Sequence, residues 1–230
     1  SGLTGITAIT AGGWHSFGLE PDGTLWAWGY NFDGRLGDGS TTNRTSPVKI
    51  TSLTGVIAVA AGSWHSLAVK NGGTVHAWGN NSRGQLGDGT TTQRNSPVQV
   101  PGLMGIATVA AGFYHSLAVR TDGVLQTWGA NSYGELGDGA RTFASSPTQV
   151  VDLSGVVSVV AGNSHNLALK ADGTVRAWGD NTSQLGDGTT TSRSAPVPVS
   201  GLTGAAAIAA GSFHSLAVKT DGTGWTWGNN

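Results

Sequence analysis

Short apolar segments alternate with polar turns along the whole chain, and the alternation repeats at a fixed interval. In the second repeat, apolar runs occupy residues 56–61, 66–70, 74–79 and 97–100, each bounded by Gly, Asn, Asp or Pro. Segments of this length that are rich in β-branched, aromatic and small apolar residues are typical of β-strands. We find no segment with sustained helical periodicity. Each repeat is therefore predicted to form four short strands.

The repeat unit is about 50 residues long, and recurring residues define it. The histidines and the tryptophans recur together at spacings of 50, 50, 50 and 49. They are His15, His65, His115, His165 and His214, and Trp28, Trp78, Trp128, Trp178 and Trp227. A Leu-Gly-Asp-Gly block also recurs, at 36–39, 86–89, 136–139 and 185–188. Residues 1–230 are expected to form a single repeat domain, with units at 3–50, 53–100, 103–150, 153–199 and 202–230.

Four-stranded units with a period of about 40–50 residues are typical of the blades of a β-propeller. The first strand of each unit carries little side-chain bulk, as in 58–62, which suits an innermost strand beside a central axis. The recurring tryptophan on the third strand is predicted to fill the gap between neighbouring blades. Pro97 begins the fourth strand and suits an outer edge, because proline cannot donate to a ladder. We predict an all-β propeller with four complete blades and three strands of a fifth.

Composition and charge narrow the classes of function. The net charge is −1, and only 11% of the residues are charged. Nucleic-acid-binding proteins usually carry a basic excess, so no nucleic-acid partner is expected. No apolar run approaches the roughly 18 residues of a membrane span, so no membrane insertion is expected. Cysteine is absent, which excludes disulfides and cysteine–zinc sites.

The evenly spaced histidines are interpreted as framework residues. Whole blades separate them, whereas a single metal ion needs bonds of about 2 Å. Ser16 follows His15, but neighbours along a strand point to opposite faces, so they do not form a nucleophile–base pair. The chain also lacks the Gly-x-Ser-x-Gly elbow of many hydrolases. We therefore predict no catalytic residue, no metal ligand and no cofactor, and we expect the chain not to be an enzyme.

The aspartates of the Leu-Gly-Asp-Gly blocks are predicted to stabilise turns. Each long loop offers one recurrent carboxylate, whereas Ca²⁺ takes six to eight oxygen ligands, so calcium is the weaker alternative. Arginines are expected to pair with these aspartates in three copies, and the third copy has Ala144 at that position. The pairs are Asp38 with Arg44, Asp88 with Arg94, and Asp187 with Arg193, whereas Asp138 has no such arginine.

The loops after the first and third strands are expected to share one face of the disc. This face carries most of the variation between copies, and varied positions are those that the framework does not dictate. Exposed aromatic residues and arginine are frequent interface anchors. The candidate partner-binding residues are Trp14, Tyr30, Phe32, Arg35, Trp64, Arg83, Tyr114, Tyr133, Phe143 and Phe213. For Trp14, Trp64, Tyr114 and Phe213, the alternative is that they cap the blade junctions.

The spaced blocks together resemble the repeat of the regulator of chromosome condensation family. The second copy contains Val-Ala-Ala-Gly-x-x-His-Ser-Leu-Ala-Val, then Ala-Trp-Gly-x-Asn, Gly-Gln-Leu-Gly-Asp-Gly and Ser-Pro-Val, and the likeness extends over residues 3–230. The resemblance implies a propeller of typically seven blades, which needs about 350 residues at this spacing. The chain is therefore expected to be a fragment, to close as a smaller ring, or to be completed by another chain. An open array exposes apolar blade faces, so self-association or ring completion is expected.

The resemblance also implies a function. We expect a non-catalytic binding or scaffold module that presents variable loops to a protein or glycan partner. The low lysine and arginine content resembles bacterial secreted or cell-surface arrays, so an extracellular or cell-surface location is expected. One alternative is a carbohydrate-binding propeller, in which exposed aromatic residues stack on sugars. A second alternative is guanine-nucleotide exchange on a small GTPase, although the regular spacing leaves no room for a large insertion.

Overall fold

The computed structural model describes residues 3–229, and within this range the chain forms antiparallel β-sheets without helices. Blade 1 contains β1 (Ala8–Ala11), β2 (His15–Leu19), β3 (Leu25–Gly29) and β4 (Arg44–Lys49). Blade 2 contains β5 (Val56–Ala61), β6 (His65–Lys70), β7 (Val75–Gly79) and β8 (Arg94–Gln99). Blade 3 contains β9 (Ile106–Ala111), β10 (His115–Arg120), β11 (Leu125–Gly129) and β12 (Ala144–Gln149). Blade 4 contains β13 (Val156–Ala161), β14 (His165–Lys170), β15 (Val175–Gly179) and β16 (Arg193–Pro198), and blade 5 contains β17 (Ala205–Ala210), β18 (His214–Lys219) and β19 (Gly224–Gly228).

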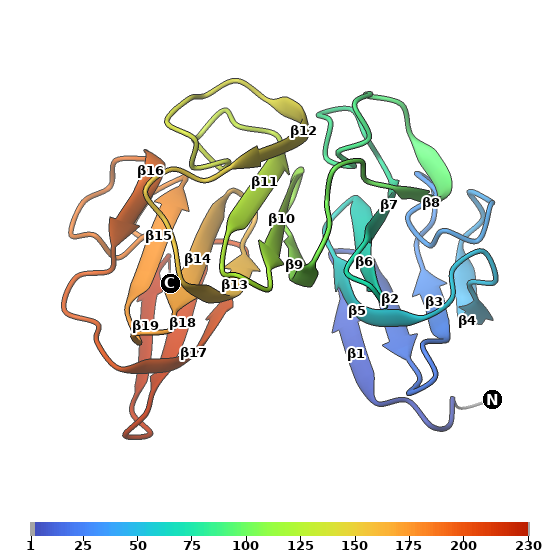
Figure 1. Ribbon diagram of the computed structural model, residues 1–230, viewed down its shortest axis with the longest axis horizontal. Coiled ribbons are helices and arrows are strands. Elements are labelled where there is room, and N and C mark those ends of the chain that lie inside the picture. Colours follow the sequence, from blue (N-terminus) through green and yellow to red (C-terminus); the bar gives the residue numbers. More distant parts are fainter. Residues whose placement is uncertain (1–2, 230) are drawn as a thin grey trace.

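Each blade is a meander in which every strand pairs with the next one along the chain (Figure 1). Four sheets have four strands and the last has three, which confirms the predicted fold class and blade count. The fourth strand starts earlier than predicted, because Arg94 already pairs with Gly79 ahead of a bulge in the ladder. Pro97 consequently lies inside β8, on the outer edge of the sheet, where proline is tolerated. No helix of the described residues is long enough to cross a membrane.

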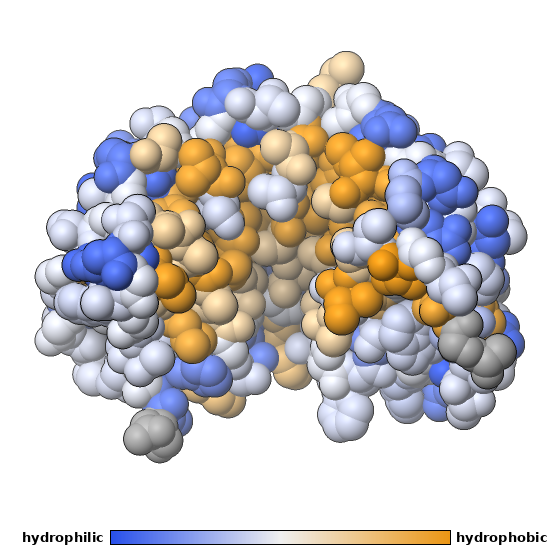
Figure 2. Space-filling view, turned by 90° about the horizontal axis from the view of Figure 1, so that it is seen from below, coloured by the Kyte–Doolittle hydropathy of each residue, from blue (hydrophilic) through white to orange (hydrophobic). Residues whose placement is uncertain are grey.

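The five blades follow one another around a central hollow. The first strand of each blade contacts the first strand of the next blade, which confirms that the small residues of this strand lie innermost. Figure 2 shows the hollow from below, with apolar side chains gathered around it and an opening on one side. The opening lies between blades 1 and 5, so the described blades form an arc and not a closed ring.

The hydrophobic cores lie between blades, not within them. Trp78 of blade 2 packs in one cluster with Phe17, Leu36 and Ile50 of blade 1. Trp128 and Trp178 pack in the same way against blades 2 and 3. All three indoles are completely buried, which confirms that the recurring tryptophan fills the junction. Trp28 and Trp227, in the two end blades, are only half-buried.

Candidate interaction surface

One backbone carbonyl of each long loop accepts hydrogen bonds from the next blade. The Arg35 carbonyl accepts one from Trp78 Nε1 and one from Ser66 Oγ, both at 2.8 Å. Because Ser66 gives its proton to this carbonyl, its Oγ accepts from His15 Nε2 of the preceding blade, at 2.8 Å. The same arrangement recurs at the next junctions, around the carbonyls of Gln85, Glu135 and Gln184.

The fourth copy departs from this pattern in residue type only. Asn166 replaces the serine, and its Oδ1 accepts from His115 Nε2 at 2.7 Å. Its Nδ2 donates to the Glu135 carbonyl at 2.8 Å. An asparagine side chain combines the acceptor and the donor that a serine hydroxyl supplies with one atom. Both versions require the proton of the histidine to be on Nε2.

Burial keeps these histidines neutral. It lowers the pKa of His15 to about 3, with a smaller contribution from the Arg35 cation. Burial also lowers the pKa of His65 to about 3 and that of His165 to about 4. Ser66 is buried and its proton points to a carbonyl, so the His15–Ser66 contact is not a catalytic dyad. The four histidines of blades 1 to 4 thus belong to the framework, whereas His214 in the end blade is exposed.

A buried asparagine organises each long loop, and the sequence analysis assigned it no role. Asn31 Nδ2 donates to Asp38 Oδ1 and to the Ser40 and Thr42 carbonyls, each at 3.1 Å, while its Oδ1 accepts from Leu36 N. Asn81, Asn131 and Asn181 occupy the same place in the next three loops. The signal was present in the sequence, since this asparagine follows every Trp-Gly pair by two positions in these copies.

The predicted aspartate–arginine pairs are confirmed. Arg44 approaches Asp38 at 2.6 Å, and Arg94–Asp88 and Arg193–Asp187 follow at 2.8 Å. Burial acts to raise the pKa of Asp38, but the hydrogen bonds from Ser40 and Arg44 outweigh burial and hold that pKa below its ordinary value. These carboxylates are therefore already neutralised by donors of their own loop.

The loops after the first and third strands share one face, as predicted. The Tyr30 amide donates to the Trp14 carbonyl at 2.9 Å, and Asn80 donates to the Trp64 carbonyl at the same distance. Ala130 and Tyr114 are joined in the same way at 2.8 Å. We call this side of the molecule the loop face.

Most of the candidate partner-binding residues are accessible on the loop face. Trp14 and Phe32 are the most exposed, at 65% and 69%, and Tyr30, Tyr133, Phe143 and Phe213 are exposed to 40% or more. Arg83 is exposed, whereas Trp64 and Tyr114 are half-buried. The exposed aromatic residues of the loop face thus belong to blades 1, 3 and 5, whereas Trp64 and Tyr114 add half-buried rings on blades 2 and 3. The equivalent loops of blade 4 carry Asn163, Ser164 and Thr182 instead.

Arg35 differs from the other candidates because its side chain is completely buried. It donates from Nη1 to the Ser63 carbonyl of blade 2 at 2.8 Å, and from Nη2 to Asp33. Its Cζ lies 5.0 Å from the Tyr30 ring centroid and 4.6 Å from that of Trp64. Arg35 therefore does not contact solvent, and it instead supports the aromatic residues around it.

The aromatic residues form a column that crosses three blades. Trp64 stacks on Tyr114 with centroids 6.3 Å apart and planes inclined by 10°, and Phe113 meets both rings edge-on. With Arg35 between Tyr30 and Trp64, the order along the column is Tyr30, Arg35, Trp64 and Tyr114. Trp14, Tyr30 and Trp64 line a pocket of about 260 Å³, which we call the aromatic pocket.

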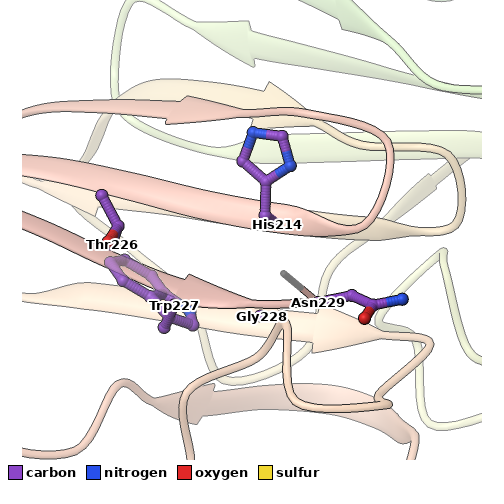
Figure 3. A pocket seen from close by; sticks show the side chains of 5 residues that line it. All are labelled: His214, Thr226, Trp227, Gly228 and Asn229. Carbon is purple, nitrogen blue, oxygen red and sulfur yellow. The ribbon is translucent and has the colours of Figure 1, made fainter.

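A second hollow, of about 390 Å³, lies in blade 5 and is not a ligand site. Figure 3 shows His214, Thr226 and Trp227 around it, with Gly228 and Asn229. In blade 3 the long loop packs at this place, where Thr127, the equivalent of Thr226, donates from Oγ1 to the Leu136 carbonyl at 2.6 Å. The hollow in blade 5 therefore corresponds to the volume that a long loop fills in the complete blades.

Comparison with known proteins supports the architecture. A family model for the RCC1-like domain matches residues 1–230. The structure of human WBSCR16 is similar with a TM-score of 0.86 and 24% identity, over 98% of this chain and 62% of that protein. Prp20p from Saccharomyces cerevisiae is similar with a TM-score of 0.68 and 24% identity, over 97% of this chain and 72% of Prp20p. The ectodomain of the Arabidopsis thaliana receptor kinase ACR4 is similar with a TM-score of 0.56 and 19% identity, over 97% of this chain and 63% of that one. The chain thus spans about 62% of the length of WBSCR16.

Proposed function

Because the chain belongs to the family of RCC1-like domains, we propose that it is a non-catalytic binding module whose loop face holds a protein partner. The observation that carries this proposal is the set of exposed aromatic side chains on the loop face of blades 1, 3 and 5, above a framework of buried hydrogen bonds. Large aromatic residues on a rigid surface are frequent anchors of protein interfaces. Most other residues of the face are small or already bonded within their own loops, so the aromatic residues are its distinctive chemistry.

Two structures of one neighbour, yeast Prp20, supply a precedent for a protein as the partner. Yeast Prp20 has been crystallised with Kap60, and Prp20p from Saccharomyces cerevisiae has been studied for its binding to Gsp1p and histones. The identities of 22% and 24% make the fold the common property, so these particular partners are not transferred to this chain. The precedent supports the partner class, which is protein.

Site-specific photo-crosslinking tests which face binds. A benzophenone amino acid is placed at Tyr133 or Phe143 on the loop face, and in matched controls at Asp122 or Asp172 in exposed turns between the second and third strands. The proposal expects a discrete protein adduct from the loop-face positions after irradiation in an extract of the source cells. Adducts that form equally well from the control positions contradict it, and so does the absence of adducts from the loop face.

We also propose that the chain self-associates through its end blades. Ile9 of blade 1 is 80% exposed, whereas its equivalents Val109 and Val159 are buried against the preceding blade. Val218 of blade 5 is exposed, although its equivalents Val69 and Val119 are buried. Such apolar faces favour association. Light scattering of the 230-residue chain at several concentrations measures the degree of self-association. A monomer that persists at high concentration contradicts this proposal.

A further inference from the structure

The aromatic pocket is built from two blades. Trp14 lies between β1 and β2, Tyr30 follows β3, and Trp64 lies between β5 and β6. Trp14 and Tyr30 stand at the surface, and Trp64 forms a half-buried wall. Pockets for small organic ligands usually have volumes of roughly 300–1,000 Å³. At about 260 Å³, this pocket is the size for one bulky group, not for a larger molecule enclosed on all sides.

The lining of the pocket does not suit a ligand with many hydroxyl groups. Its surface is predominantly apolar, and none of its three residues carries a carboxylate or an amide. Trp64 Nε1 is itself buried and has no acceptor, so it is not available as a donor to a ligand. A sugar in this pocket loses water from its hydroxyls without gaining matching hydrogen bonds, which is unfavourable.

Arg35 makes the pocket unsuitable for a cation as well. Aromatic cages bind quaternary ammonium groups through the electron-rich faces of their rings. Here the Arg35 guanidinium already lies over the rings of Tyr30 and Trp64, and it occupies their protein side because it is buried and does not line the pocket. A second cation on the open side meets rings whose opposite faces already interact with the Arg35 guanidinium, which weakens their attraction for it.

Two walls of the pocket, Tyr30 and Trp64, are held in place by contacts within the protein. Arg35 joins the two blades by its bond to the Ser63 carbonyl, next to Trp64. Asp33 pairs with Arg35 and accepts a long contact of 3.5 Å from Asn80 Nδ2 of blade 2. The Tyr30 amide bonds to the Trp14 carbonyl. A preformed pocket spends less binding free energy on ordering its own side chains.

We infer that the aromatic pocket receives one uncharged apolar side chain, of the size of leucine, methionine or phenylalanine, that projects from the protein partner. This inference rests on the proposed function and adds the chemistry of the anchor residue. The excluded charge, the scarcity of hydrogen-bonding groups and the small volume all favour such a side chain. Trp14 and Tyr30 determine this specificity by direct contact, and Arg35 acts through the rings.

Indole resonances of the full chain provide the test. Tryptophan Nε1–H signals of the ¹⁵N-labelled protein are followed while N-acetyl-leucinamide, N-acetyl-phenylalaninamide, methyl α-glucopyranoside or choline is added. Trp14→Phe and Trp64→Phe variants assign the two signals. We expect saturable shifts of the Trp14 and Trp64 signals with the two apolar probes, and no shift with the sugar or choline at the same concentration. Saturable binding of either polar probe at these residues overturns the inference, and so does the absence of any response to the apolar probes.

Three variants locate the effect. Trp14→Ala is expected to weaken binding of the apolar probes at least tenfold, whereas Phe213→Ala, which changes the equivalent residue of blade 5, leaves it unchanged. Arg35→Gln introduces the residue of copies 2 and 4 and is expected to allow choline to bind. Undiminished apolar binding by a folded Trp14→Ala protein overturns the inference. Crosslinks from Tyr133 and Phe143 report separately on the loop face, so failure of the pocket is distinguishable from failure of the proposed function.

Discussion

The blade junctions and the loop face follow opposite rules, although both are made by the same repeats. At the junctions, four carbonyls accept hydrogen bonds from the same tryptophan and from the same serine or asparagine, and these contacts are buried except that of Trp227, which is partly buried. On the loop face, neighbouring copies carry Tyr30, Asn80, Ala130 and Asp180 at one equivalent position. Side chains that contact another blade thus have nearly the same residue type in every copy, whereas the residue type varies where side chains are exposed to solvent.

This difference teaches where to look for recognition in a repeat protein. The five histidines are the most regular features of the sequence. The four of them in blades 1 to 4 are buried and cannot contact a partner. Most of the irregular aromatic residues are accessible, and the six exposed ones lie on the loop face of blades 1, 3 and 5.

Acid is expected to have the largest effect, and to act through the junctions. The pKa of His15 and of His65 is about 3 in the folded state, whereas an unfolded histidine titrates near 6.5. Below pH 6.5 the unfolded chain therefore binds protons that the folded chain does not, so stability falls with decreasing pH until the folded pKa is reached. The expected loss is about 1.4 kcal/mol for each such histidine and each pH unit.

Urea unfolding at several pH values between 6.5 and about 5 measures this loss, above the range in which most carboxylates protonate. His65→Gln keeps a donor for Ser116 and removes one titrating group, so it is expected to reduce the slope. A stability that does not change over this range contradicts the assignment of neutral buried histidines.

Removing one junction tryptophan is expected to have the next largest effect. Trp128→Ala empties a completely buried volume between blades 2 and 3 and deletes the bond to the Gln85 carbonyl. We expect a loss of about 3–5 kcal/mol in the free energy of unfolding. Trp14→Ala on the loop face is the matched control and is expected to change it by less than about 0.5 kcal/mol. Denaturant titration of both variants compares the two regions directly, and equal losses contradict the division between them.

A smaller effect is expected from the residue that varies at a junction. Asn166→Ala leaves His115 Nε2–H buried without an acceptor, which costs about 1–3 kcal/mol. Asn166→Ser restores the residue of the other copies and is expected to cost less than about 1 kcal/mol. Thermal and denaturant unfolding compare the two variants. If alanine and serine are equivalent here, the hydrogen bonds at this junction do not contribute as described.

The smallest predicted effect is a gain in stability in the fourth long loop. Ser183 has φ +128°, and its equivalents in the first three loops are glycines with φ between +69° and +89°. Ser183→Gly removes strain from a conformation that residues with a Cβ rarely adopt, and we expect it to stabilise by about 0.5–1 kcal/mol. Ser82→Gly in the second loop changes a residue whose own φ is not positive, so it is expected to give no gain. A loss of stability in Ser183→Gly contradicts this account.

The fold was predictable from the sequence because every strand is repeated with its turns. Five copies of the same alternation locate the strands to within a few residues, and the small residues of the first strand indicate the central axis. The start of the fourth strand was predicted too late, because the pairing of Arg94 with Gly79 depends on a bulge that has no mark in the sequence.

The partners of the framework residues could not be predicted from the sequence. With a spacing of 50, a histidine is equally compatible with a serine of its own blade or of the next one, and only the stacking of blades selects Ser66 for His15. Arg35 was assigned to partner binding because its position varies between copies and because arginine is a frequent interface anchor. Its equivalents Gln85, Glu135 and Gln184 are also buried, and their common place before the buried leucine of each block was a signal that this position faces inward.

The carbonyl of each long loop also has a consequence for how such proteins lengthen. The preceding blade always supplies the acceptor and the histidine, and the following blade always supplies the indole and the hydroxyl or amide. A duplicated unit of about 50 residues therefore carries both sets of groups, those that contact the preceding blade and those that contact the following blade. It can be inserted between any two blades. Gene duplication can therefore add or remove whole blades without requiring a new kind of contact between blades. Each inserted copy also adds a set of loops on which selection can act.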